Sequence, residues 1–298
     1  MATDADKGGR DRPNARVRAA ALREQQRKRE TRRKLLGIGG VVVLVAVIVV
    51  VMVVVAGGKK DNKKNSTVTA VAPAAAVQQV TTVPAGDLAK GDASKVTALP
   101  KKVSGSALTF DSKPGLLYFG AEYCPFCAAE RWPLVVAMSR FGTWSNLGQT
   151  TSASQDVFPS TPTFSFVGAK FSSQYLGFSS VETETNQLVN GSYTKLQTPT
   201  SQQTELLSKY DAKGSIPFVD YGNKFVTVGA SYDPSVLKGK SFDEIAAAVA
   251  DPASEIGKSV LGTANVMTAA ICESTGGKPG AVCDAADIKK LRGTLNAQ

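Results

Sequence analysis

Hydrophobic positions divide the 298-residue chain into stretches of different character. A polar, basic stretch covers residues 1–34, and 22 uncharged, mostly apolar residues follow at 35–56. A helix of that length would measure about 33 Å, enough to cross a hydrocarbon core of about 30 Å. We therefore predict a transmembrane anchor at 35–56. A cleaved signal peptide is the alternative, but its apolar core usually spans only about 7–15 residues.

Small and polar residues dominate 57–75, which has the composition of a flexible tether. Apolar residues recur from Val77 onwards, so the folded domain is predicted at 76–298. Within it, a turn signal at 113–115 precedes an apolar run at 116–120 that is rich in strand formers. That run predicts a buried strand.

The sequence Cys-Pro-Phe-Cys at 124–127 comes directly after this strand, and residues 128–138 have the composition of a helix. Pro125 suits the first turn of a helix, because its missing N–H would have no partner there in any case. Cys124 is thus predicted at the helix N-terminus, where unpaired N–H groups and the helix dipole favour its thiolate. Cys127 would lie one turn further on, within reach of a disulfide.

The net charge of +10 is concentrated beside the apolar segment. Residues 1–34 carry 12 basic and 5 acidic side chains, residues 57–64 carry a net +3, and residues 65–298 are neutral overall. This distribution favours a lipid bilayer as partner and predicts no nucleic-acid binding, which would need a basic face on the domain itself. The larger Lys/Arg cluster before the segment predicts a cytoplasmic N-terminus and an extracytoplasmic domain.

The chain contains no histidine, which excludes Ser-His-Asp and Cys-His catalysis and His-ligated metals. Its four cysteines all follow the apolar segment, as expected for an oxidising compartment. Cys272 and Cys283 lie between predicted helices at 264–272 and 285–292, and a structural disulfide between them is the favoured interpretation. A relay to Cys124 and Cys127 is the alternative. The spacing is poor for zinc, so we predict no metal and no cofactor.

A second motif follows at 214–223, where Gly-Ser-Ile-Pro-Phe-Val-Asp-Tyr-Gly-Asn precedes the β-forming run 224–229. Together with the strand, the Cys-Pro-Phe-Cys sequence and a helix containing Pro133, it resembles the thioredoxin superfamily. The resemblance implies an α/β, thioredoxin-like fold in which a cis proline opens a strand that faces the cysteines and turns into a hairpin, here after Pro217. The chain also resembles a poorly characterised bacterial family of membrane-anchored thioredoxin-like proteins, a domain of unknown function, over 76–298.

The resemblance assigns roles to individual residues. Cys124 would be the nucleophile, and Cys127 would resolve the mixed disulfide. Tyr118 stands where thioredoxins bury an acid that assists reduction, so an oxidase or isomerase is expected rather than a reductase. The residues expected to bind substrate are Ile216, Pro217, Tyr123, Phe126 and Trp132.

The distance of 93 residues from Cys124 to Pro217 is about twice that of thioredoxin, so the resemblance implies an insertion. Residues 143–199 predict strands and loops, and residues 200–210 a helix. The expected function is thiol–disulfide exchange on cysteines of exported proteins, with a membrane thiol oxidase as partner for regeneration. The alternatives are an inert disulfide at Cys124–Cys127 or a redox-inactive binding or scaffold module at the cell surface.

Overall fold

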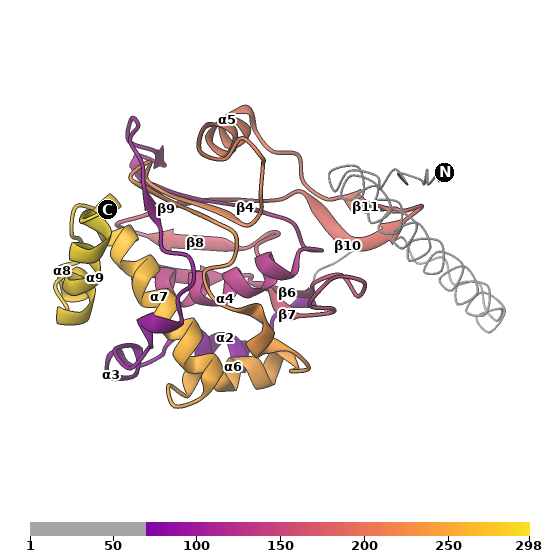
Figure 1. The fold of residues 1–298 in the computed structure, drawn as a ribbon, viewed down its shortest axis with the longest axis horizontal. Helices are drawn as coiled ribbons and strands as arrows, with labels where there is room; N and C mark the ends of the chain where they lie inside the picture. Colours follow the sequence, from indigo (N-terminus) through magenta and orange to yellow (C-terminus); the bar gives the residue numbers. More distant parts are fainter. Residues whose placement is uncertain (1–69) are drawn as a thin grey trace, which may run out of the picture. The chain divides into compact units, whose positions relative to one another are not determined.

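The computed structural model describes residues 70–298, which form a mixed α/β domain (Figure 1). At the centre of its main sheet, β4 (Lys113–Gly120) pairs with β12 (Phe218–Tyr221) on one side and β9 (Gly177–Glu182) on the other. β12 runs antiparallel to β4, whereas β9 runs parallel to it. The sheet is completed by β13 (Phe225–Val228) and β2 (Lys101–Lys102) beyond β12, and by β3 (Thr109–Phe110), a hairpin partner of β4.

Several helices begin at side chains that accept hydrogen bonds from their first turns. Thr200 and Ser241 each form a capping box, which satisfies N–H groups that would otherwise lack partners. The helices of the described residues are α2 (Ala74–Thr81), α3 (Ala85–Leu88), α4 (Pro125–Ser139), α5 (Ser201–Tyr210), α6 (Phe242–Ala250), α7 (Glu255–Ser274), α8 (Gly280–Cys283) and α9 (Ala286–Asn296). Short 3₁₀ turns lie at Ala93–Lys95 and Pro234–Leu237.

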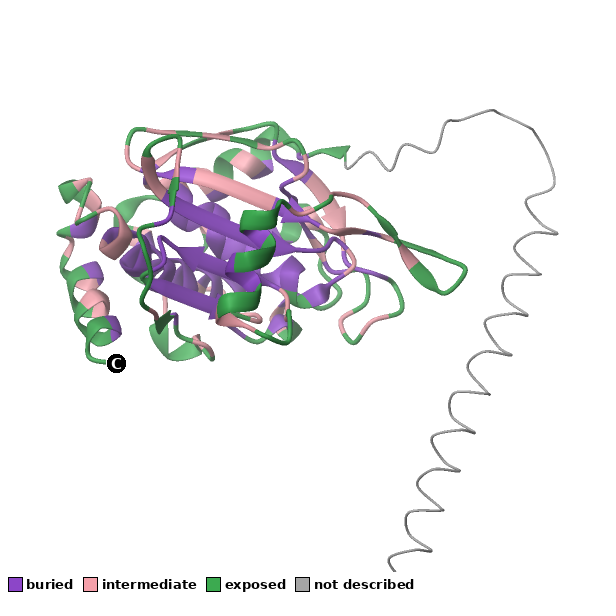
Figure 2. Cartoon of the chain, turned by 90° about the horizontal axis from the view of Figure 1, so that it is seen from above, coloured by how far each residue is buried: buried purple, intermediate pink, exposed green. Residues whose placement is uncertain are grey.

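Side chains of β4 alternate between two hydrophobic clusters, one on each face of the sheet. Leu116 and Tyr118 belong to the larger cluster, with residues of α4 and α7, while Leu117 and Phe119 belong to the smaller one, with residues of α5. Figure 1 shows α5 on one side of the sheet and α4 and α7 on the other, and Figure 2 shows the buried strands between them. Because both faces are covered, β4 is an uninterrupted apolar run.

Smaller sheets occupy most of the sequence between α4 and α5. Of the predicted insertion at 143–199, the segment that forms β9 belongs to the main sheet, and the rest adds strands around it. These are β6 (Gly148–Thr151) between β1 (Ala70–Val71) and β7 (Pro162–Ser165), the pair β5 (Gly142–Ser145) and β8 (Lys170–Ser173), and the hairpin β10 (Glu184–Val189) and β11 (Ser192–Lys195).

The buried strand, the helix after it, the hairpin after Pro217 and the helix at 200–210 are confirmed. The turn predicted at 113–115 is wrong, because these residues begin β4 and the chain turns at Asp111 and Ser112, both with positive φ. Pro114 is tolerated there since pairing with β9 starts one residue later, at Gly115.

The domain also begins earlier than residue 76. β1 pairs with β6, and Ala72 is buried in the larger cluster, so residues 70–75 fold with the domain instead of extending the tether. The anchor predicted at 35–56 lies outside the described residues. Within residues 70–298, no helix has both the length and the apolar character that a bilayer crossing requires.

Candidate functional site

Cys124 caps the N-terminus of α4, as predicted. Its backbone is extended, with φ −75° and ψ 120°, and its Sγ accepts a hydrogen bond from the N–H of Cys127 at 3.2 Å. Pro125 fills the first helical position. The sulfur therefore sits where unpaired N–H groups and the helix dipole concentrate positive potential.

The second motif lies against this sulfur. The Ile216–Pro217 peptide bond is cis and directly precedes β12. The thiol of Cys124 donates to the carbonyl oxygen of Ile216 at 3.9 Å, although 92 residues separate the two in sequence. Pairing of β12 with β4 explains this proximity. The cysteine motif follows the end of β4 and Ile216–Pro217 precedes the start of β12, and these two ends lie side by side because the strands are antiparallel. The structure thus brings Cys124, Cys127, Ile216 and Pro217 together.

The two thiols are electrostatically unlike, although neither forms a disulfide. The side chain of Cys127 donates to Cys124 and lowers its pKa, against the effect of burial, and the backbone N–H of Cys127 and the charge of Arg131 lower it further. Burial and the adjacent Cys124 raise the pKa of Cys127 well above that of an ordinary thiol. Cys124 is therefore the better nucleophile, and Cys127 holds the proton.

Access to Cys124 is narrow, since it is only 4% exposed and Cys127 is fully buried. Phe126, between them, is 39% exposed, and its ring meets the edge of Phe158 at 5.9 Å. A pocket of about 350 Å³ opens beside the sulfur, lined by Thr97, Phe126, Ile216, Gly229, Ala230, Tyr232, Asp233 and Pro234. Ile216 belongs to both, since it lines the pocket and its carbonyl oxygen accepts from the Cys124 thiol.

Of the predicted substrate-binding aromatic residues, Trp132 is misplaced. It is fully buried, with Phe164 and Phe242 at 4.7 and 5.0 Å, and its Nε1 donates to the carbonyl of Pro162. α4 is covered by α7 and β7 and presents almost no free face, so Trp132 is a core residue. Tyr123 is half-buried and stacks on Tyr193 of β11 at 4.2 Å.

Sequence reasoning missed a buried ion pair below the cysteines. Arg131 and Glu182 are both fully buried and joined by two hydrogen bonds, Nε to Oε1 at 2.8 Å and Nη2 to Oε2 at 2.7 Å. Arg131 also donates to the carbonyl of Ala121 at 3.0 Å. The charged residues 130–131 inside an otherwise apolar helix were the available signal, whereas nothing in the sequence identifies Glu182 as the partner.

Glu130 is buried beside this pair, on the other side of the helix backbone. Its carboxylate accepts hydrogen bonds from the N–H and the hydroxyl of Ser231, at 2.8 and 2.6 Å. Burial raises the pKa of Glu130 to about 7, although the Ser231 hydrogen bonds oppose the shift. Ser231 precedes Tyr232, so Glu130 fixes the loop that lines the pocket next to Cys124.

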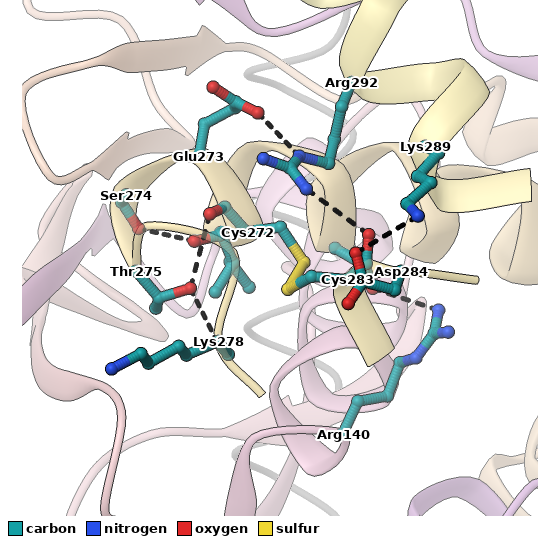
Figure 3. Close-up of a disulfide and its surroundings, with 12 residues drawn as sticks. Arg140, Cys272, Glu273, Ser274, Thr275, Lys278, Cys283, Asp284, Lys289 and Arg292 are labelled. Atoms are coloured by element: carbon teal, nitrogen blue, oxygen red, sulfur yellow. Dashed lines mark hydrogen bonds and ion pairs between the residues drawn. A yellow bond between two sulfur atoms is a disulfide. The ribbon is translucent and has the colours of Figure 1, made fainter. Parts of the chain in front are cut away.

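The second cysteine pair is a disulfide, with the Cα atoms of Cys272 and Cys283 5.5 Å apart. Both residues are fully buried and join the end of α7 to α8. Figure 3 shows Arg292 of α9 beside this link, donating to Glu273 at 2.6 Å and to the carbonyl of Cys283 at 3.3 Å. The bond uses both sulfurs, which leaves them unable to complete a zinc site with Cys124 and Cys127.

The fold and the site together define a mixed α/β domain that carries two thiols of different pKa at a helix N-terminus. The chain belongs to the family described as "Domain of unknown function (DUF929)", whose model matches residues 100–273. That range contains both cysteines of the site, Ile216, Pro217 and the Arg131–Glu182 pair. No curated protein and no solved structure matches the chain.

Proposed function

We propose that this protein is a membrane-anchored, extracytoplasmic thiol–disulfide oxidoreductase of the oxidase or isomerase type. The observation that carries the proposal is the position of Cys124, which caps α4 with a lowered pKa beside the cis Ile216–Pro217 peptide. A stabilised thiolate is the nucleophile that thiol–disulfide exchange requires.

The strand order supports a thioredoxin-like fold for the domain. β4 leads into the helix of the cysteines, its parallel neighbour is β9, and its antiparallel neighbour β12 follows the cis proline and turns back into β13. In this interpretation β5–β8 and β10–β11 are insertions before and after β9.

The exchange proceeds in two displacements. A substrate thiolate attacks Sγ of Cys124 in the Cys124–Cys127 disulfide, forming a mixed disulfide and releasing Cys127 as a thiolate that takes up a proton. A second substrate thiolate then displaces Cys124, so the substrate loses two electrons and the protein gains them. A membrane thiol oxidase that passes two electrons to a quinone would restore the disulfide. Isomerisation would start instead from the reduced protein: the Cys124 thiolate attacks a substrate disulfide and releases one substrate thiolate, and another substrate thiolate then displaces Cys124, so the substrate disulfide is moved without net oxidation.

The Cys272–Cys283 disulfide supports an oxidising compartment for the domain. Together with the predicted anchor at 35–56 and its basic N-terminal flank, it supports a single-pass topology with a cytoplasmic N-terminus. Exported proteins with cysteines are the expected substrates.

Trapping of the mixed disulfide tests the proposal. In cells that produce the full-length Cys127→Ser variant, Cys124 should accumulate thiol-sensitive adducts with exported proteins, because the resolving sulfur is gone. The matched control is Cys124→Ser/Cys127→Ser, which should give none. If the two variants give the same pattern, the proposed activity is wrong.

The 4% exposure of Cys124 favours a second candidate, a thioredoxin-like binding or scaffold module whose cysteines are inactive. Such a module would bind partners through the Phe126 pocket without covalent exchange. It predicts no adducts in the trapping experiment and partner capture that survives the loss of both cysteines.

A further inference from the structure

Burial of the Arg131–Glu182 ion pair is unfavourable for the stability of the domain. Both side chains are fully buried, and removing two charges from water costs free energy that their attraction only partly returns. Apolar residues of similar volume would hold α4 against β9 at least as well. A buried pair of this kind is therefore better explained by its effect on neighbouring groups than by its contribution to stability.

The backbone of α4 and β9 places the Arg131–Glu182 pair close to the cysteines. Arg131 follows Cys127 by four residues, so the two side chains lie on the same face of α4, one turn apart. Glu182 ends β9, in register with Gly120 of β4. The hydrogen bond from Arg131 to the carbonyl of Ala121 fixes the guanidinium beneath the segment that leads to Cys124.

Two buried donors near the thiols lack partners among the described residues. Nη1 of Arg131 and the hydroxyl of Tyr118 are fully buried and make no hydrogen bond there. The guanidinium lies over the Tyr118 ring, 5.7 Å from its centroid. Most buried donors are paired, so two unpaired ones call for an explanation. They would stabilise a nearby negative charge that is present in only one state of the protein. The thiolate of the reduced dithiol is such a charge.

The two halves of the ion pair act on the sulfurs unequally. Beyond burial and Cys124, which raise the pKa of Cys127, the Arg131 charge lowers it and the Glu182 charge raises it more weakly. Arg131 is also among the groups that lower the pKa of Cys124, after the Cys127 hydrogen bonds and against burial. The sulfurs therefore experience a net positive neighbour although the pair is formally neutral.

We propose that Arg131 and Glu182 are positioning residues that set the oxidising strength of the Cys124–Cys127 pair, Arg131 by stabilising its reduced, ionised form and Glu182 by limiting that effect. The inference rests on the proposed function, since it assumes that the dithiol is redox-active. A more stable thiolate makes the disulfide a stronger oxidant.

The test compares alkylation of Cys124 at about pH 6 in the reduced, full-length protein in detergent, with mass spectrometry to identify the modified sulfur. Arg131→Met removes the positive charge and should slow alkylation about tenfold, whereas Glu182→Gln leaves it unbalanced and should speed alkylation about threefold. Equilibration with glutathione should rank the variants in the same order, Glu182→Gln the stronger oxidant and Arg131→Met the weaker.

This role predicts that Arg131→Met and Glu182→Gln change the alkylation rate in opposite directions. A purely structural role predicts the same direction for both, because each variant would lose packing. Arg131→Lys keeps the charge with fewer hydrogen bonds and should alkylate within about twofold of wild type. If Arg131→Met does not fold, the Glu182→Gln and Arg131→Lys results decide alone. A fast wild-type Cys124 with unchanged or equally shifted variants overturns the inference and leaves the proposed function standing. A wild-type Cys124 as slow as an ordinary thiol overturns both.

Discussion

The two cysteine pairs of this domain are built in opposite ways. Cys272 and Cys283 are fully buried, joined to each other, and placed where α7 meets α8. Cys124 and Cys127 are separate, stand at the start of α4 and have pKa values shifted in opposite directions. The first pair links two chain segments through a disulfide, whereas the two thiols of the second pair differ in pKa. Local electrostatics, rather than the presence of cysteine, distinguishes the two pairs.

The surroundings of the pairs differ in the same sense. Around Cys124 and Cys127, the buried charges of Glu130, Arg131 and Glu182 are all enclosed by the fold. Around Cys272–Cys283, the charges of Arg292 and Glu273 pair near the surface, with side chains 24% and 18% exposed. We therefore expect pH and charge substitutions to affect the first region, and reduction to affect the second.

The largest expected effect is on exchange activity. Cys124→Ser should reduce oxidation of a dithiol substrate to the uncatalysed rate, because it removes the only sulfur of the pair placed to accept a thiolate's attack. Cys272→Ala/Cys283→Ala is the matched control and should retain activity at temperatures where the fold persists. Activity that depends on the second pair would instead support a relay between the two.

The free energy of unfolding should depend more on Cys272 and Cys283 than on Cys124 and Cys127. Loss of the Cys272–Cys283 bond, which spans 11 residues, should lower the free energy of unfolding by about 3 kcal/mol, measured by chemical denaturation. Cys124→Ser/Cys127→Ser should lower the stability of the reduced protein by less, since no bond between these two residues is lost. Equal losses for both double variants would erase the distinction between the pairs.

The pH dependence of stability should come from the first region. The folded-state pKa of Glu130 is raised from 4.5 to about 7, so the native state binds the extra proton. The stabilisation from this carboxyl is complete below its unfolded pKa and is lost as pH rises toward 7, by about 3 kcal/mol in all. Glu130→Gln, neutral at every pH, should flatten that part of the profile.

Burial also raises the pKa of Glu182 and that of Asp220, the latter to about 6, so the test is the difference between the wild-type and Glu130→Gln profiles. Glu205→Gln is the matched control, because this carboxylate is exposed on α5. A Glu130→Gln profile parallel to that of the wild type would mean that Glu130 stays ionised in the fold.

The smallest expected effect concerns the pocket beside Cys124. Phe126→Ala should weaken oxidation of an unfolded protein substrate several-fold while leaving oxidation of glutathione unchanged, because only the larger substrate spans the pocket. Val228→Ala, at a similarly exposed apolar position, serves as the control. An equal loss with both substrates would indicate a disturbed Cys124 instead of a lost contact.

The sequence was most informative where local pattern decides structure. The apolar run of β4 and Pro125 at the start of α4 were predicted from neighbouring residues and are confirmed, as is the hairpin after Pro217, which the resemblance implied. The disulfide followed from the position of two cysteines between predicted helices. In each of these cases the determining interactions span few residues.

Prediction failed where distant contacts decide. The resemblance placed Trp132 among the residues expected to bind substrate, but Phe164 and Phe242, 32 and 110 residues further along the chain, enclose it. Glu182 is 51 residues from Arg131, and no local pattern pairs them. The parallel strand β9 was hidden in the insertion for the same reason, since its partner β4 lies far upstream.

The central claim is that Cys124 ionises at a lower pH than an ordinary thiol and Cys127 at a higher one, and titration of thiolate ultraviolet absorbance tests it most directly. The reduced wild-type protein should show a first transition at lower pH than an ordinary thiol, absent from Cys124→Ser, and a separate transition of Cys127 at higher pH than an ordinary thiol. A single transition near the ordinary value of about 8.5, unchanged by Cys124→Ser, would contradict the account.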